Sequence, residues 1–323
     1  TIAIAFAVLG AAYAILGGLR AVAVSDTYGG ILVLAMGLLI VVLSLMAIDF
    51  DFSGIPAERL TLIGDNASPI PWPTLLTGMF LIQIFYWSTN QTITQRAMAA
   101  PTVKEAQKGV YAAAFIRVVF IPSMVVIPGI VAFKLYGDIG DQAYGRIVGD
   151  LLPGWLSGIF AAAIAAAVLS SFNSMVNSSA AMYVCDLHEA YINDKPNLRL
   201  LSGVATAIFV IIAVSMVPIY AQSDSIINLL QELWGLISMP ILACFAVGLL
   251  FRNVDYRAAI AAVIIGVLMY AGFIWLWMPL HYIHMSFFTF LTCVAMALLI
   301  NRFGLGKKAE FIGLQKEQLQ RAV

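Results

Sequence analysis

A run of hydroxyl and amide side chains interrupts an otherwise apolar stretch of this sequence. Seven of the ten residues from Ser170 to Ser179 are Ser or Asn, and the preceding residues 158–169 carry no charge. At helical spacing Ser170, Ser174, Asn177 and Ser178 share one face, with Ser171 beside it. Stacked hydroxyls offer oxygen atoms without charge, which suits a hard, partly dehydrated cation such as sodium. Helix packing is the alternative, because Ser lets helices approach closely and bonds to its own backbone.

The elements that carry this run are predicted to cross a membrane. The chain is 62% hydrophobic and 11% charged, whereas a soluble domain carries about 25% charged residues. Its apolar blocks reach the roughly 20 residues that a bilayer crossing requires. We therefore predict an all-α polytopic membrane protein, in contact with the lipid bilayer. The nine expected spans cover residues 1–18, 27–49, 72–98, 108–135, 154–190, 199–220, 225–251, 256–278 and 281–302.

The distribution of Lys and Arg outside the spans predicts the orientation of the chain in the membrane. Only Arg59, Lys134 and Arg146 fall on the side opposite the Arg20 loop, so the Arg20 side and the C-terminal tail over 303–323 are predicted to be cytoplasmic. The expected location is the plasma membrane, or the inner membrane of a bacterium. The net charge of +0 gives no indication of a nucleic-acid partner. A weaker helical pattern over 141–152 is expected to lie at the surface.

The first residues indicate where the chain begins relative to the whole protein. Thr1 opens directly into apolar sequence without an initiator Met, so we expect the chain to begin inside a larger protein.

An acidic residue, Asp26, lies near the start of the second expected span. One interpretation is a helix N-cap, where a carboxylate meets free N–H groups and the positive end of the helix. The other is a cation ligand, because ionisable groups within membrane spans are costly and commonly functional.

The third expected span is dense in polar and aromatic residues around Tyr86 and Trp87. Their rings offer flat faces for stacking on a sugar, and Gln83 and Asn90 add donors and acceptors. An interfacial aromatic belt is the alternative. It fits poorly, because these aromatics lie about 15 Å inside the expected edge at Arg96, counted at 1.5 Å per residue.

Further polar groups occur in the fourth and seventh expected spans. Gln231 and Glu232 lie early in the seventh, and the alternative interpretation of Glu232 is an acidic residue in the first turn near the outer interface. Arg117 either snorkels to the cytoplasm or lines a polar cavity. Phosphate-binding, zinc and nucleophile motifs are missing from the sequence, so an enzyme is not predicted.

Five stretches, in this order and spacing, resemble the solute:sodium symporter family, the group of sodium/glucose cotransporters. They are Gly17–Val22 with Ser25 and Asp26; Tyr86–Trp87 with Asn90–Gln91 and Gln95–Ala100; Ala106–Gly109 through Ile127–Gly129; Ser170–Ser178 to Asp186; and Gln231–Glu232 with Gly235. The aromatic and polar third span is most similar to the sugar and inositol branch.

The resemblance implies a LeuT-like fold of two inverted five-helix repeats, with solute bound at mid-membrane. Residues 1–49 would be the last two helices of repeat one, 72–251 repeat two, 256–302 accessory helices, and 303–323 a cytoplasmic tail. The N-terminal helices of repeat one would lie outside this chain.

The resemblance also implies site residues. The shared sodium site would use the carbonyl of Ala167 with Ser170 and Ser171. Ligands for a possible second sodium would fall on Asp26, Ser170, Asn173 and Ser174, where Asn173 departs from the usual hydroxyl. The solute pocket would involve Gln83, Tyr86 as inner gate, Trp87, Arg117, Gln231 and Glu232, with Arg117 at a position where sugar carriers usually have Lys.

The implied function is sodium-coupled symport of a sugar or polyol such as a hexose or inositol, with Na⁺ and the solute as partners. One alternative is an anionic sugar such as a sialic acid, with Arg117 pairing its carboxylate. The other is a transporter-like membrane sensor of solute.

Overall fold

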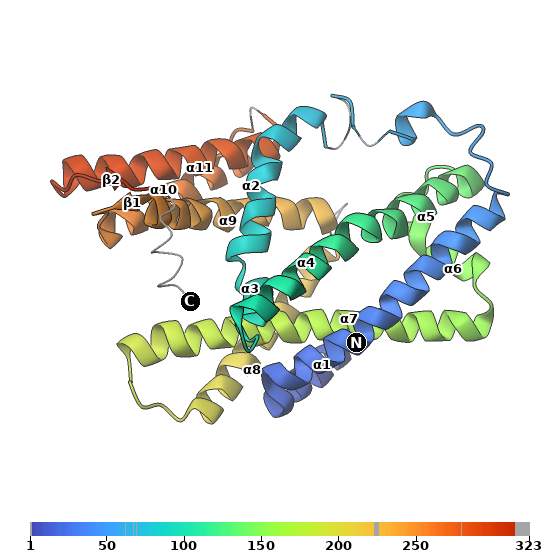
Figure 1. Cartoon of the computed structure of the whole chain (residues 1–323), viewed down its shortest axis with the longest axis horizontal. Coiled ribbons are helices and arrows are strands. Elements are labelled where there is room, and N and C mark those ends of the chain that lie inside the picture. The colour runs from blue at the N-terminus through green and yellow to red at the C-terminus, as the bar shows by residue number, and fades with distance from the viewer. Residues whose placement is uncertain are drawn as a thin grey trace. The chain divides into compact units, whose positions relative to one another are not determined.

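The computed structural model of the chain is almost entirely helical (Figure 1). It describes residues 2–61, 63–66, 68, 70–222, 226–278 and 280–313, with only the backbone described at 2–7, 9, 11, 13–22 and 226–228. The α-helices are α1 (Ile2–Ala47), α2 (Gly78–Ile84), α3 (Gln91–Met98), α4 (Val103–Val119), α5 (Ile121–Tyr136), α6 (Ala143–Leu151), α7 (Gly154–Ala181), α8 (Leu198–Tyr220), α9 (Ile226–Leu250), α10 (Tyr256–Trp275) and α11 (Tyr282–Leu299).

The shorter elements extend or connect these helices. They are three 3₁₀ turns (Ala57–Arg59, Trp72–Leu76 and Gly140–Gln142), three π-helical segments (Phe85–Thr89, Met182–Glu189 and Ile300–Gly304) and two strands, β1 (Phe251–Arg252) and β2 (Glu310–Phe311). The chain divides into two compact units. Unit 1 comprises Thr1–Leu62 with Gln95–Pro218, and unit 2 comprises Ile63–Thr94 with Ile219–Val323.

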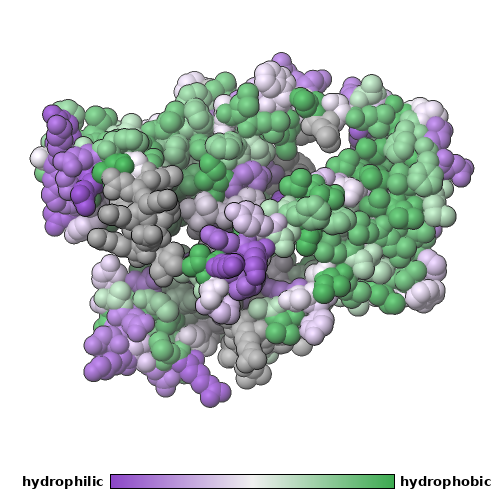
Figure 2. All heavy atoms as spheres, viewed as in Figure 1, coloured by the Kyte–Doolittle hydropathy of each residue, from purple (hydrophilic) through white to green (hydrophobic). Residues whose placement is uncertain are grey.

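Seven helical segments among the described residues are long and apolar enough to cross a membrane, as expected for a multi-pass protein. They are Ala23–Ala47, Val103–Tyr136, Gly154–Glu189, Leu198–Tyr220, Leu229–Leu250, Tyr256–Trp275 and Tyr282–Gly304, which match the second and the fourth to ninth expected spans. Large apolar side chains stay exposed on them, such as Leu268, which is 67% exposed. Figure 2 shows extended apolar areas on the visible face, a pattern that favours lipid over water as the neighbour.

The third expected span, 72–98, is broken rather than continuous. Helix α2 passes into a π-helical turn, and Asn90 then takes an extended conformation before α3 begins. The side-chain oxygen of Asn90 accepts from the backbone N–H of Thr92 over 3.0 Å, which gives α3 a new N-terminal cap. A single helix was the wrong expectation here, because the cap and the π-turn satisfy the backbone groups that the break releases.

Helix α1 is helical throughout, yet its path bends. An added Cβ on Gly10 would lie 2.7 Å from Asn173 Oδ1 on α7. Asp26 bonds Ser170, which lies on α7 three residues before Asn173. A straight helix would separate Gly10 from Asp26 by about 24 Å, sixteen residues at 1.5 Å each. The path therefore bends between these positions, in the stretch that contains the expected turn at 17–20.

The core of unit 1 forms where α1, α5, α6 and α7 meet. Ile40, Val131 and Ile147 come from three of these helices and are fully buried. They belong to one apolar cluster that also includes Met36, Ile48, Ala132, Leu152 and Phe160. Ile147 lies on α6, so the helix expected over 141–152 is confirmed, and its apolar face packs on the core. This packing fixes α1 against α7, the two helices that carry the polar residues described below.

Unit 2 is built on close helix crossings at small residues. An added Cβ on Gly78 of α2 would lie 1.7 Å from the carbonyl oxygen of Ile283 on α11. At Gly266 of α10 it would lie 2.2 Å from Sγ of Cys293 on α11. Thr77 Oγ1 and His284 Nδ1, 2.9 Å apart, add a polar contact beside the first crossing. Small residues thus let α2, α10 and α11 approach without side chains between their backbones.

The buried amide side chain of Asn301 connects three chain segments at one end of unit 2. Asn301 is fully buried, accepts from the N–H of Asp255 over 2.9 Å, and donates to the carbonyls of Asn253 and Lys307 over 3.0 and 2.9 Å. Lys307 Nζ bonds Asp255 over 2.7 Å, and this bond holds the pKa of the Asp255 carboxyl below its usual value. Strands β1 and β2 pair beside this contact. The start of the expected 303–323 tail is therefore folded onto the helices, and residues 314–323 lie outside the described part.

Candidate functional site

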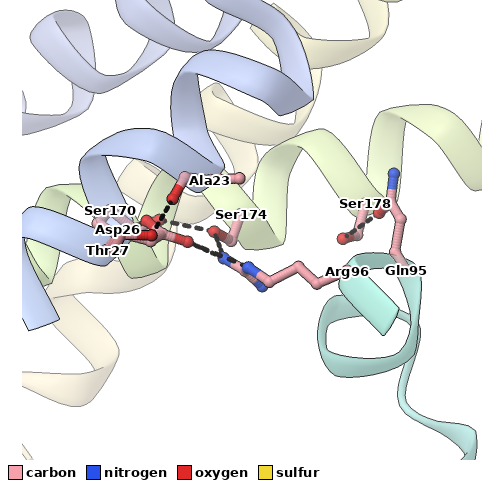
Figure 3. Close-up of polar contacts among 8 residues, drawn as sticks. All are labelled: Ala23, Asp26, Thr27, Gln95, Arg96, Ser170, Ser174 and Ser178. Atoms are coloured by element: carbon pink, nitrogen blue, oxygen red, sulfur yellow. Dashed lines mark hydrogen bonds and ion pairs between the residues drawn. The ribbon is translucent and has the colours of Figure 1, made fainter. Parts of the chain in front are cut away.

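Three helices bring polar side chains of unit 1 together. Asp26 lies inside α1, Ser170 and Ser174 lie one turn apart on α7, and Arg96 lies near the C-terminal end of α3. Figure 3 shows the guanidinium of Arg96 reaching from α3 to the Asp26 carboxylate and the Ser174 hydroxyl. The helical spacing of α7 points both serines to the same side.

The Asp26 carboxylate uses both oxygens in this cluster. Its Oδ1 accepts from the hydroxyl of Ser170. Its Oδ2 accepts from Nε of Arg96 over 3.1 Å and from Nη2 of the same side chain. Two N–H groups of one guanidinium thus bind one carboxylate oxygen, a charge-assisted contact stronger than a neutral hydrogen bond.

Ser174 joins the guanidinium to α7. Its hydroxyl donates to the carbonyl of Ser170 over 2.8 Å and accepts from Nη2 of Arg96. The neighbouring Gln95 accepts from the hydroxyl of Ser178 through Oε1 over 2.8 Å, one further turn along the same face. The hydroxyl face predicted from the sequence is therefore confirmed as a polar surface, and α3 is held to it at two successive residues (Figure 3).

The cluster is partly buried but reachable. The side chains of Arg96 and Asp26 are 34% and 20% exposed, and Ser174 is buried. An open pocket of about 320 Å³ is lined by Ala23, Asp26, Thr27, Arg96 and Ala99. Ions in this pocket would meet the carboxylate and the guanidinium side by side.

This geometry bears on two interpretations of the sequence, and it corrects the first. Asp26 is not a helix N-cap, because α1 is helical on both sides of it and its carboxylate bonds side chains from α3 and α7. The possible second sodium site at Asp26, Ser170, Asn173 and Ser174 stays a prediction, and Asn173 points away from the other three residues. Asn173 is buried, its Oδ1 has no hydrogen-bond partner among the described residues, and it faces Gly10. It lies about 100° around α7 from its neighbours, so it points to a different part of α1.

The residues expected for the shared sodium site occupy consecutive turns of α7. Ala167 and Ser170 are half-buried, and Ser171 is exposed. Ser170 is turned toward Asp26, whereas Ser171 lies on the adjacent side of the helix. Ser170 is thus shared between the expected ligand set and the Asp26 cluster, and the role of the three as sodium ligands stays a prediction.

In unit 2, the residues expected to bind solute belong to an aromatic group at the π-helical turn. Tyr86 stacks on Trp234 of α9 with 5.8 Å between ring centroids and an interplanar angle of 30°. It meets Trp87 edge to face at 5.0 Å. The indole N–H of Trp87 donates to Gln83 Oε1 over 3.1 Å. The structure thus brings Gln83, Tyr86 and Trp87 together and adds Trp234.

Gln231 on α9 is oriented from a different helix. The hydroxyl of Tyr282, at the start of α11, donates to Gln231 Oε1 over 2.8 Å. Tyr282 is buried, whereas Gln231 and Glu232 are half-buried. Arg117 belongs to unit 1, where it is exposed near the end of α4.

Three residues of these groups escaped sequence reasoning. Arg96 was placed at the edge of a span and in one of the five family stretches but was given no role, although acidic residues inside membrane helices commonly pair with a cation. Trp234 and Tyr282 carry no local signal, because aromatic residues in apolar helices are common. Only their contacts with Tyr86 and Gln231 distinguish them.

A comparison with models of protein families shows the family of this chain. A model of the sodium:solute symporter family matches residues 1–266. The chain belongs to the sodium:solute symporter family. The resemblance seen in the five sequence stretches is therefore confirmed.

Curated relatives include both characterised and uncharacterised transporters. An uncharacterized symporter of Escherichia coli (strain K12), YidK, is 32% identical over 81% of this chain and 48% of its own length. The sodium/glucose cotransporter of Vibrio parahaemolyticus is 35% identical over 59% of this chain and 39% of its own length. Sodium/myo-inositol cotransporter 2 of Homo sapiens is 27% identical over 62% and 33%. The chain thus spans less than half the length of these relatives.

A solved structure shares the fold. It is a Na⁺-coupled sialic acid symporter in a substrate-bound outward-open state, and it superposes with a TM-score of 0.77 over 96% of this chain and 67% of its own. Sequence identity is 17%, so the likeness concerns the fold alone. The predicted LeuT-like, all-α membrane fold is confirmed.

Proposed function

We propose that the full transporter to which this chain belongs couples sodium entry to the import of a neutral sugar or polyol, such as a hexose or an inositol. The observation that carries the proposal is the family match, together with curated relatives named for glucose and myo-inositol. The hydroxyl face of α7 supports it, because it supplies uncharged oxygens of the kind that sodium prefers.

Two groups of residues take separate roles in this proposal. Sodium binds the carbonyl of Ala167 with the hydroxyls of Ser170 and Ser171. The solute binds near Tyr86, which serves as inner gate, and the remaining pocket residues are Gln83, Trp87, Arg117, Gln231 and Glu232. The stacked rings of Tyr86 and Trp234 offer an apolar face for a sugar ring.

The coupling follows from the charge of sodium. Moving one positive charge into a cell through 100 mV releases about 2.3 kcal/mol, which supports about fifty-fold accumulation of a neutral solute. The transporter would lie in the plasma membrane, or in the inner membrane of a bacterium, with its C-terminal end in the cytoplasm. The excess of Lys and Arg on that side supports this orientation.

The test is uptake by the full-length protein in proteoliposomes. Labelled glucose or myo-inositol should accumulate with external sodium and stop accumulating when choline replaces it. Liposomes without protein are the control. Uptake that is indifferent to sodium would overturn the coupling.

An anionic sugar is the second candidate, because Arg117 offers a cation where a neutral solute needs none. Competition for uptake between neutral sugars and sugar acids distinguishes the two candidate solutes. Inhibition of uptake by a sialic acid, with no inhibition by neutral sugars, would favour the anionic solute.

A further inference from the structure

Basic side chains gather at one end of unit 2, where α9 ends, α10 begins and α11 ends. Strands β1 and β2 lie at this end (Figure 1), and Figure 2 shows hydrophilic residues gathered there on the visible face. The three membrane-spanning segments that meet here are Leu229–Leu250, Tyr256–Trp275 and Tyr282–Gly304. Five exposed basic residues fall within four positions of the end of one of these segments, namely Arg252, Arg257, Arg302, Lys307 and Lys308.

This basic end of unit 2, defined as residues 251–257 and 301–311, carries an excess of positive charge. Its five basic residues face two acidic ones, Asp255 and Glu310, which leaves a net charge of +3. Lys307 Nζ bonds Asp255 over 2.7 Å, so that pair is neutral. Within the part of the chain that the structure describes, the other four basic residues form no ion pair. Their charges therefore remain available to an anionic ligand.

Packing holds the backbone that carries these charges. The buried Asn301 bonds backbone groups of Asn253, Asp255 and Lys307. The chain reverses at Gly306, whose φ of +67° lies in the left-handed region that favours glycine, and β2 then pairs with β1. Each of the four unpaired basic residues lies within two positions of one of these contacts. A cluster held in this way loses less conformational entropy on binding than a flexible basic tail does.

Exposed aromatic side chains accompany the charges at the basic end. Phe303 and Phe311 are 77% and 70% exposed, and Tyr256 is exposed as well. The Arg302 guanidinium lies 6.0 Å from the ring centroid of Phe303, and that of Arg257 lies 5.7 Å from the ring centroid of Tyr256. Aromatic and long cationic side chains are stable together at the headgroup level of a bilayer, beside the ends of spans. This combination favours a lipid over a soluble partner.

We propose that the basic end of unit 2 binds the headgroup of an anionic phospholipid. The guanidinium groups donate to the phosphate oxygens, a pairing that suits their planar geometry, and the exposed rings lie at headgroup depth. A zwitterionic lipid offers the same phosphate without a net charge, so it binds more weakly. The site lies on the side predicted to be cytoplasmic, the side on which anionic lipids attract basic segments next to spans. Its occupant is neither sodium nor the transported solute.

The experiment titrates the purified full-length protein in detergent with phosphatidylglycerol and measures bound lipid by native mass spectrometry. We expect the zwitterionic phosphatidylcholine to bind with an apparent Kd about ten-fold higher or more. One basic residue near an anionic lipid surface contributes about five-fold in affinity. The triple variant Arg252→Gln/Arg257→Gln/Arg302→Gln should therefore raise the apparent Kd for phosphatidylglycerol by about ten-fold or more. The variant with Lys at the same three positions keeps the charges and should stay within about five-fold of the wild type.

A matched control removes the same number of charges from another surface. Lys104, Lys195 and Arg199 are exposed basic residues of unit 1 on the side predicted to be cytoplasmic. The variant Lys104→Gln/Lys195→Gln/Arg199→Gln should keep the wild-type affinity for phosphatidylglycerol. An equal rise of the apparent Kd in both triple variants would overturn the proposal, because binding would then follow the total charge of the protein rather than this site.

Size-exclusion chromatography checks that the first triple variant is folded. If it is not, Arg302→Gln alone decides: an apparent Kd about five-fold higher supports the site, and an unchanged Kd overturns it. A wild type that binds phosphatidylglycerol and phosphatidylcholine equally well would also overturn the proposal. These affinities are measured without sodium or solute, so they do not depend on the outcome of the uptake test.

Discussion

The hydroxyl of Tyr282 donates to Oε1 of Gln231 over 2.8 Å, so α11 orients a residue of α9 that is expected to contact the solute. Tyr282 belongs to the region assigned to accessory helices, outside the predicted repeats. It is buried, and its contact fixes which end of the Gln231 amide remains available as a donor. A helix that is expected to lie outside the inverted repeats thus contacts a residue that is predicted to recognise solute.

Replacing Tyr282 by Phe removes this one hydrogen bond and keeps the ring. A hydrogen bond of this kind contributes about 0.5–1.5 kcal/mol, so we expect KM for the solute to rise by about two- to twelve-fold. Uptake kinetics in proteoliposomes measure it. Tyr256→Phe, at an exposed tyrosine of α10, is the matched control and should keep the wild-type KM. An unchanged KM for Tyr282→Phe would separate Tyr282 from solute binding.

Ser171→Ala tests the predicted sodium site. Loss of one oxygen ligand should raise the sodium concentration for half-maximal uptake by about ten-fold, a cost of about 1.4 kcal/mol. The control is Ser179→Ala, whose hydroxyl bonds the carbonyl of Met175 in its own helix. Equal sodium dependence in both variants and the wild type would remove Ser171 from the site.

Gly78→Ala tests the crossing of α2 and α11. The added methyl would lie 1.7 Å from the carbonyl oxygen of Ile283, and backbone cannot move aside as a side chain can. We expect a loss of about 1–3 kcal/mol or more of stability, measured as a lower midpoint of thermal unfolding. Gly248→Ala on α9, with open space around its Cβ, should unfold at the wild-type temperature or above. Equal midpoints would contradict the close crossing.

Asn301→Asp tests the buried amide at the end of unit 2. The substitution keeps an acceptor for the N–H of Asp255 but loses both donors to the carbonyls of Asn253 and Lys307. Unpaired buried groups cost about 1–3 kcal/mol, so thermal unfolding should begin at a lower temperature. Limited proteolysis should also cut the 305–311 segment sooner than in the wild type. Resistance equal to that of the wild type would show that Asn301 does not hold the segment.

Asp51 predicts a defined pH dependence in the loop after α1. Hydrogen bonds from Ser53 and Lys134 hold the pKa of its carboxyl well below the ordinary 3.8. Because the folded pKa is the lower one, its stabilisation is complete above pH 3.8 and is lost as the pH falls through the folded pKa. Asp51→Asn should therefore lower the unfolding midpoint at neutral pH, and this difference should vanish in strong acid. Asp141→Asn, an exposed acid of the same unit, should show no such difference, and a constant difference for Asp51→Asn would contradict the assignment.

The sequence by itself determined the membrane class, most of the spans and the polar face of α7. Apolar length and helical periodicity are local properties, and they are the same whatever the helices pack against. The five stretches also sufficed for the family, because order and spacing along the chain need no coordinates. The break at Asn90 was missed, since it depends on a side chain that caps one particular backbone N–H.

Tertiary structure alone decided which polar residues meet. The sequence favoured a helix N-cap for Asp26 over a cation ligand, whereas in the structure its carboxylate binds Arg96 of α3, 70 residues along the chain. Asn173 and Ser174 are neighbours in sequence, yet Asn173 faces Gly10 of α1 and Ser174 bonds Arg96 of α3. Electrostatic and hydrogen-bonding partners depend on distances of a few ångströms across packed helices. That information lies in the packing, and no pattern along a single helix contains it.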